Sequence, residues 1–191
     1  MKKNKFVKSI SDKSITNNKK MTQDIYKKIL INDTLSIHFN KVNNNLENYL
    51  VTCIKNNVEG KCSKHGYIKK DSVNLLSYSC GELVSDKAIF TIVYECLNSL
   101  PSENMELNCF VTSITKVGLK ARISNEDNPY LIFIARDHNY DKENFSKVNV
   151  DDIINVRVIG HRYELNDECI SIIAEFINID NYKTSINELE S

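Results

Sequence analysis

Apolar residues recur at every second position in two series between Met105 and Ile123, in the second half of the chain. Two series, separated by a short turn, place apolar side chains on one side: Leu107, Cys109 and Val111, then Val117, Leu119, Ala121 and Ile123. Period-two alternation lets one face of a sheet enter a core while the other faces water. The pattern predicts a β-hairpin with Lys120 and Arg122 on its outward face. Gly118 leaves a bare spot on that face, which suits a bulge or a close backbone approach.

Three further strands are predicted in the same half, at 130–135, 151–159 and 170–176. In the second of them Ile154, Val156 and Val158 are expected to point inward and Arg157 outward. Segments 125–129 and 164–168 have turn composition, and the polar segment 138–149 forms a long connection. Five strands with one long polar connection predict an all-β OB-fold over residues 103–180.

The first half mixes strand patterns with one helical pattern. Leu46, Tyr49, Leu50, Cys53 and Ile54 recur at helical spacing behind a cap at Asn43 or Asn44. Strands are expected at 29–31, 35–39, 58–62, 67–76 and 88–97, with turns or loops at 63–66 and 78–81. The last of these strands places one apolar series on one face: Phe90, Ile92, Tyr94 and Cys96. One helix on a small antiparallel sheet predicts an α+β domain over 23–102, ending at Pro101 and Ser102.

The two ends of the chain have different compositions. Residues 1–22 are lysine-dense and aperiodic, which predicts a disordered basic tail; the segment either is merely solvated or contacts nucleic acid or an acidic partner. Residues 181–191 are expected to fray. The formal net charge is zero, so binding to nucleic acid would depend on local patches. No apolar run is long enough to span a bilayer and no secretory signal is present, so no membrane association is expected.

A search for catalytic chemistry finds no P-loop, dinucleotide fingerprint, nucleophile elbow or metalloprotease motif. Cys62 and His65, with Cys80 and Cys96, could be combined into a zinc site, but the chain lacks a paired C-x-x-C knuckle. Reduced, buried thiols are the favoured interpretation of the six cysteines. We therefore expect no catalytic residue, no metal and no cofactor.

A basic surface on the predicted barrel is the main candidate for binding. Seven residues could follow the phosphate backbone of RNA: Lys116, Lys120, Arg122, Arg136, Arg157, His161 and Arg162. Phe110, Phe133 or Tyr163 could offer a face on which bases stack, although each of them alone is better explained by packing. Outward Lys and Arg side chains that only keep a half-exposed sheet soluble are the alternative interpretation.

Four segments carry a resemblance to a known family. They are Val58–Cys62 with Lys64–Ile68, Thr115–Leu119, and Val156–Arg162 followed by Asn166 and Asp167. In this order and spacing, between about Tyr26 and Phe176, the chain resembles the larger stalk subunit of multisubunit DNA-directed RNA polymerases, the seventh-subunit type. Its short loops and its Asn-, Lys- and Ile-rich composition are similar to versions carried by large DNA viruses.

The resemblance implies a non-catalytic polymerase subunit with an S-one-type OB barrel that holds nascent RNA. The α+β domain would be the tip domain, which docks on the polymerase core near the clamp. Its partners would be the largest subunit, the small sixth-type subunit and the smaller fourth-type stalk subunit. The implied docking residues are Ser63, Lys64, His65, Gly66, Tyr78, Gly81 and Leu83. The protein would then act inside the cell with the transcription machinery, in the nucleus or, if viral, in the host cytoplasm or the virion.

Departures from the family pattern leave other interpretations open. Barrels that bind RNA tightly carry aromatics beside the second-strand glycine, where this chain has Val117 and Leu119. A free-standing S-one-type RNA-binding protein acting in translation or RNA processing is the alternative function. Such a protein would not need the sheet predicted over 58–97.

Overall fold

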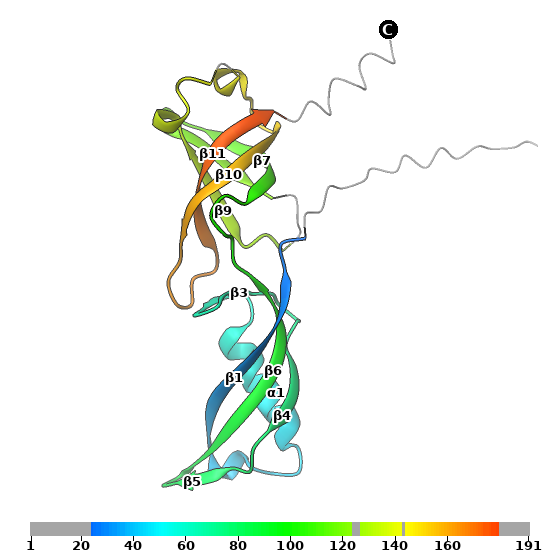
Figure 1. Ribbon diagram of the computed structural model, residues 1–191. Coiled ribbons are helices and arrows are strands. Elements are labelled where there is room, and N and C mark those ends of the chain that lie inside the picture. The colour runs from blue at the N-terminus through cyan, green and yellow to red at the C-terminus, as the bar shows by residue number, and fades with distance from the viewer. Residues whose placement is uncertain (1–23, 124–126, 143, 180–191) are drawn as a thin grey trace, which may run out of the picture.

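The computed structural model describes residues 24–123, 127–142 and 144–179. The molecule is elongated, with a β-barrel at one end and a sheet that carries one helix at the other (Figure 1). Strand β6 (Lys87–Ser99) runs from the far end of the sheet towards the barrel and organises the first half of the chain. The predicted tails, 1–22 and 181–191, lie outside the described residues.

Strand β6 is paired along both edges. On one side β1 (Lys27–His38) is antiparallel to it over its whole length, from Lys27 opposite Asn98 to His38 opposite Lys87. The other edge of β6 pairs in succession with three short strands: β3 (Gly66–Ile68), β4 (Asn74–Tyr78) and β5 (Glu82–Val84). Strand β2 (Cys62–Ser63) pairs with β3. This long central strand extends the sheet away from the barrel.

Helix α1 (Leu46–Val58) covers one face of this sheet. Leu50 and Ile54 are its buried residues, and they belong to the same apolar cluster as the even-numbered residues of β6. The helical spacing and the burial of Phe90, Ile92, Tyr94 and Cys96 were predicted, and the structure confirms both. The N-cap position is Asn45, one residue later than predicted, and its backbone N–H is bonded to the side chain of Asn43.

Three predicted boundaries in this half are wrong for local reasons. Segments 29–31 and 35–39 are one strand, because pairing with β6 continues through the polar residues between them; Phe39 then begins the 3-10 turn η1 (Phe39–Lys41). The predicted strand 67–76 is broken at Asp71, whose φ of +54° turns the chain between β3 and β4. The helix takes Val58 from the predicted strand 58–62, and Gly60 turns with a φ of +71°. Strand β5 was not predicted.

The second half closes into a five-stranded barrel, as predicted. Its strands are β7 (Glu106–Ile114), β8 (Gly118–Arg122), β9 (Tyr130–Ala135), β10 (Ile153–Arg162) and β11 (Ile170–Ile179). Around the barrel they follow the order β7–β8–β9–β11–β10 and back to β7. Of these five pairings only that of β9 with β11 is parallel. This small closed antiparallel barrel with one parallel pair is OB-like.

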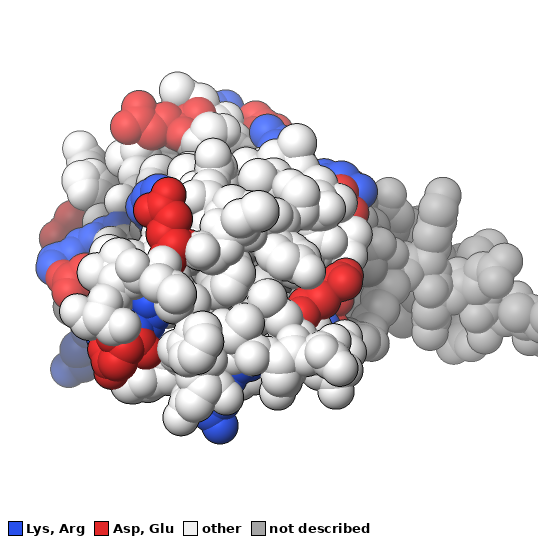
Figure 2. All heavy atoms as spheres, turned by 90° about the horizontal axis from the view of Figure 1, so that it is seen from below, with Lys and Arg blue, Asp and Glu red and all other residues white. Residues whose placement is uncertain are grey.

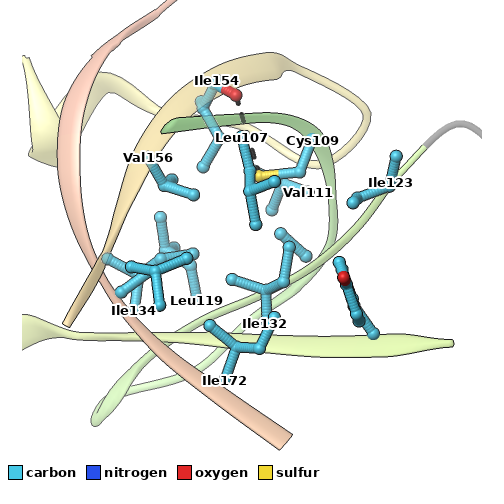
Figure 3. Packing of buried hydrophobic residues seen from close by; sticks show 14 of the residues in the cluster. Leu107, Cys109, Val111, Leu119, Ile123, Ile132, Ile134, Ile154, Val156 and Ile172 are labelled. Atoms are coloured by element: carbon cyan, nitrogen blue, oxygen red, sulfur yellow. Dashed lines mark hydrogen bonds between the residues drawn. The ribbon is translucent and has the colours of Figure 1, made fainter. Parts of the chain in front are cut away.

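The barrel interior is filled by the inward series of each strand. Figure 3 shows Leu107, Val111, Ile132 and other aliphatic side chains meeting at its centre, where the thiol of Cys109 donates to the carbonyl of Ile154. Two predictions about this half need correction. Val117 is 68% exposed because it lies in the turn before β8. The polar connection 138–149 is not only solvated loop, since Phe145 is buried against Phe176.

Backbone and side-chain hydrogen bonds join the barrel to the sheet. The N–H of Cys62 donates to the carbonyl of Asp167, and the N–H of Asn166 donates to the carbonyl of Cys62, at 2.8 and 2.9 Å. Ser99, at the end of β6, donates its hydroxyl to the carbonyl of Ile25 and lies 2.6 Å from the hydroxyl of Tyr130 at the start of β9. We call these contacts the junction.

Candidate nucleic-acid interface

The outer face of β7, β8 and β9 brings two cations next to two aromatic rings. The strand register places Arg122 of β8 opposite Phe110 of β7, and Lys120 of β8 opposite Phe133 of β9. Both cations are exposed and both rings are half-buried. Side chains directly opposite one another on a sheet face lie about 5 Å apart at their Cβ atoms. We call these four residues the β8 face.

Gly118 fixes the start of the β8 face. A Cβ atom built on it would lie 2.2 Å from the carbonyl oxygen of Ile134, so only glycine permits this approach of β8 to β9. Of the two features predicted at Gly118, the structure has the close backbone approach; a register shift of β7 with β8 lies elsewhere, between Val111 and Ser113. This shift also increases the local twist.

Two further predicted residues lie where β8 begins. Lys116 is exposed in the turn between β7 and β8. Arg136, just after β9, is half-buried; its Nε donates to the carbonyl of Lys116 at 3.2 Å, and its guanidinium lies over the ring of Phe145. Arg136 therefore holds the turn in place, and its guanidinium group has fewer N–H donors left for a phosphate group.

The other three predicted residues lie on β10, which is not a neighbour of β8 in the barrel. Arg157 is paired with Glu106 at 3.4 Å, and Arg162 is paired with Glu164 at 2.9 Å. His161 stacks on Tyr163, with the ring centroids 6.1 Å apart. The structure thus divides the seven candidates between two surfaces.

Ion pairs decide which surface keeps unbalanced positive charge. Both arginines of β10 face carboxylates, and Lys142 binds Glu175 at 2.7 Å and lowers the pKa of that carboxyl. Within the described ranges, no ion pair involves Lys116, Lys120 or Arg122. The β8 face is therefore the better candidate for phosphate contacts.

The predicted docking residues do not form one surface. Ser63, Lys64, His65 and Gly66 belong to the hairpin of β2 and β3, which pairs with the barrel end of β6 at Ser99. Leu83 pairs with Ala88, at the opposite end of β6. Eleven residues of extended strand separate the two pairings, or roughly 35 Å. The hairpin lies beside the junction, whereas Tyr78, Gly81 and Leu83 lie far from the barrel.

This far end is apolar and grooved. Figure 2 views the molecule from that end and shows a surface that is mostly uncharged, with Lys, Arg, Asp and Glu side chains mainly around its margin. Leu83 is 65% exposed and Phe39 is 56% exposed. A groove of about 550 Å³ lies between them, lined also by Val42, Tyr78 and Phe90. We call this surface the distal end; exposed apolar residues gathered in this way are typical of a protein contact.

Sequence reasoning identified Tyr78, Gly81 and Leu83 but missed other residues of the distal end. Phe39 was placed in a strand, although it lies in η1 and its side chain is exposed. Val42 was not singled out, and it is exposed. The available signal was an excess of apolar residues in segments otherwise rich in Asn, Ser and Asp.

The cysteines do not gather into one site in the part of the chain that the structure describes. Cys62 belongs to the barrel cluster, Cys96 to the sheet cluster, and Cys80 is exposed at the distal groove, so the set considered for zinc is not brought together. Burial raises the pKa of Cys62 and of Cys96 to about 11, and that of Cys109 to about 12. Protonated thiols are poor nucleophiles at neutral pH.

Of the helices in the described part of the chain, none has the length and apolar character needed to cross a bilayer.

Comparison with known proteins relates the chain to a viral protein. No family model matches the chain. The chain is similar to the protein named "Putative DNA-directed RNA polymerase subunit L376" of Acanthamoeba polyphaga mimivirus. The two are 25% identical over 174 residues, and the match covers 82% of this chain and 84% of that protein. The similarity therefore spans both the sheet and the barrel.

Proposed function

We propose that this chain is a non-catalytic stalk subunit of a multisubunit DNA-directed RNA polymerase of a large DNA virus. In this proposal the distal end docks on the polymerase core, near its clamp, and the β8 face of the barrel contacts nascent RNA. The hairpin 63–66 lies beside the junction and contributes to binding the smaller stalk partner. The largest subunit and the small sixth-type subunit form the docking site.

The observation that carries the proposal is the separation of two different surfaces in one elongated molecule. An apolar, grooved distal end suits a protein partner. A face with exposed cations opposite aromatic rings suits single-stranded nucleic acid, which is bound by stacking and by charge. The mimivirus relative, whose name describes a polymerase subunit, supports the choice of assembly.

The distal end also bears on the alternative function. A free-standing RNA-binding protein would expose Leu83, Phe39 and their neighbours to water permanently. A subunit covers such residues with its partner, and burying apolar surface contributes about 25 cal/mol per Å². We therefore favour the polymerase subunit over a free-standing factor in translation or RNA processing.

Substitution at the distal end tests the docking proposal. The double variant Leu83→Asp, Val84→Asp places two charges on exposed positions of β5, and we expect it to lose the polymerase core during affinity purification. Gly81 is left unchanged, because a Cβ atom there would lie 2.7 Å from the ring of Phe90 and would disturb the fold itself.

The matched control replaces two similarly exposed apolar residues of the barrel half, Val150→Asp and Ile159→Asp. We expect the control to recover the polymerase core as the unmodified protein does. Full recovery of the core by the β5 variant, or equal loss in both variants, would contradict docking through the distal end.

A further inference from the structure

Strand β1 forms a long edge of the sheet. Within the described residues it pairs with β6 alone, from Lys27 to His38, and this register contains no shift and the strand no proline. Figure 1 shows β1 along the outside of the sheet. On the other side of β6 the strands are short, and β2 there is bonded to the barrel through Cys62. A long, flat edge without a bulge is a template on which another strand can pair.

Hydrogen bonds elsewhere in the sheet show which backbone groups of β1 face outward. Thr91 of β6 lies opposite Thr34, but its backbone N–H and carbonyl are both bonded to Ser79, on the far side of β6. The backbones of Thr34 and Thr91 are therefore not bonded to each other, and the N–H of Thr34 donates to the carboxylate of Asp33 at 2.8 Å. Bonded and non-bonded pairs alternate along an antiparallel ladder, so the even-numbered residues of β1 direct their N–H and C=O groups to the open edge.

The part of this edge nearer the barrel is open. In the described ranges, no strand covers the outward backbone groups of Lys28, Leu30 and Asn32. At Thr34 the carboxylate of Asp33 already occupies the edge, and charged side chains placed in this way are a common protection against unwanted pairing. We call residues 27–33 the open stretch.

The side chains of the open stretch indicate what kind of strand would fit. On the face that α1 covers, Ile31 is buried in the sheet cluster and Ile29 packs against it. Lys27 and Asp33 flank them on the same face, and neither is in an ion pair within the described residues. Leu30, on the other face, is 67% exposed. The complementary strand has apolar side chains beside the isoleucines, an acid beside Lys27 and a cation beside Asp33.

The open stretch is too small to hold a partner by itself. Its seven residues are about 23 Å long and a sheet is about 10 Å thick, so the edge offers roughly 230 Å². A stable interface buries about 800 Å² on each partner. The protein that pairs here must therefore contact the chain at another surface as well. A subunit of a larger assembly does so, whereas edge-to-edge contact between two copies of this chain does not.

We propose that β1 accepts an extended segment of another subunit of the polymerase assembly, which pairs with the open stretch as an additional strand of the sheet. Main-chain hydrogen bonds to Lys28, Leu30 and Asn32 hold the segment, and its alternating side chains provide selectivity. The open stretch pairs with the barrel end of β6 and the distal end with the opposite end, so the two contacts are separate. This inference rests on the proposed function, because the partner is a polymerase subunit.

Amide hydrogen exchange, followed by mass spectrometry with residue resolution, tests the pairing directly. The full-length protein alone is compared with the complex purified through its tag. In the isolated protein the amides of Lys28, Leu30 and Asn32 should exchange fast, while those of Ile29 and Ile31, which are bonded to β6, should exchange slowly. In the complex we expect the first three to slow at least tenfold. Unchanged exchange of these three in the complex would overturn the proposal.

Two variants of Leu30 test the outward N–H itself. Leu30→Pro removes an N–H that β6 does not use, and proline is tolerated at such edge positions, whereas Leu30→Val keeps the N–H and an apolar side chain. Leu30→Pro should lower the recovery of one polymerase subunit at least fivefold, and Leu30→Val should stay within twofold of the unmodified protein. Equal recovery of every subunit with both variants would contradict the pairing. Urea unfolding shows whether the proline variant is folded, and the exchange experiment decides if it is not.

The remaining outcomes separate this inference from the proposed function. Slow exchange of the three amides in the isolated protein, at any concentration, would show that this chain covers its own edge. Slowing that increases with concentration would show a second copy there, and either result would overturn the proposal. Recovery of the polymerase core without slower exchange would reject only the strand pairing. Absence of polymerase subunits with the unmodified protein would reject the proposed function, and with it the partner named here.

Discussion

The hydroxyl of Ser99 is the most informative single group at the junction. It is fully buried, donates to the carbonyl of Ile25 at 2.9 Å, and lies 2.6 Å from the hydroxyl of Tyr130, which therefore donates to it. Ser99→Ala leaves a buried donor and a buried acceptor without this partner. Each costs about 1–3 kcal/mol, so we expect a loss of about 2–6 kcal/mol in the free energy of unfolding.

The partner substitution should cost less, because hydrogen bonding is asymmetric here. Tyr130→Phe removes one donor, while Ser99 still donates to Ile25, so we expect a loss of about 1 kcal/mol. The double variant should be about 1 kcal/mol more stable than Ser99→Ala alone, since no unpaired tyrosine hydroxyl remains. Burial raises the pKa of Tyr130, so the hydroxyl stays protonated at neutral pH.

Urea unfolding followed by circular dichroism measures all three variants. The denaturant midpoint should shift while the m-value stays the same, because the surface exposed on unfolding is unchanged. Equal losses for the two single variants, or a double variant as unstable as their sum, would refute the assignment of donor and acceptor. A loss below about 0.5 kcal/mol for Ser99→Ala would show that water enters the junction and replaces the hydrogen bonds of the Ser99 hydroxyl.

Two further predictions concern the barrel and the thiols. Gly118→Ala should destabilise the protein by about 1–3 kcal/mol in urea unfolding, because its Cβ would meet the carbonyl of Ile134. The control Gly160→Ala, whose Cβ would have nothing within 4 Å, should change stability by less than about 0.5 kcal/mol. Similar losses of stability in the two variants would contradict this explanation. Iodoacetamide at pH 8 should label Cys80 first and label the buried thiols only after unfolding: Cys62, Cys96 and Cys109. Burial raises the pKa of these three thiols above the unfolded value of about 9. Their contribution to stability is therefore fully present below pH 9 and should be lost as the pH rises towards 11. A free energy of unfolding that does not change between pH 9 and 11 would contradict this.

The barrel could be predicted well because its signal is local. Alternation in 105–123 and 151–159 identifies inward positions directly, and the structure confirms Leu107, Cys109, Ile154 and Val156 as buried. Val117 breaks the series because turn geometry, not periodicity, places its side chain. Period-two reasoning is therefore reliable within these strands and fails in the turn that precedes β8.

The sheet was harder to predict because its strands depend on a distant partner. β5 has three residues and all of them are exposed, so its sequence carries no burial pattern; only pairing with β6 makes it a strand. The polar residues within β1 are likewise held extended by the opposite strand. Propensity cannot report such pairing, since tertiary context decides it.

The candidate site was predicted as residues but not as surfaces. Lys120 and Arg122 were placed on one outward face, and the register brings Phe110 and Phe133 opposite them. The separation of Arg157 from this face follows from closure of the barrel, and the distance between the hairpin 63–66 and Leu83 follows from the length of β6. Neither can be read from sequence spacing alone.

The most direct test of the central claim is to identify the proteins that the full-length protein binds in its native source. The tagged protein would be purified at moderate salt and the recovered proteins identified and quantified by mass spectrometry. We expect the two largest polymerase subunits and one small stalk partner in amounts comparable to the tagged chain. Recovery of ribosomal or exosome proteins in their place, or of the tagged chain alone, would contradict the assignment to a polymerase.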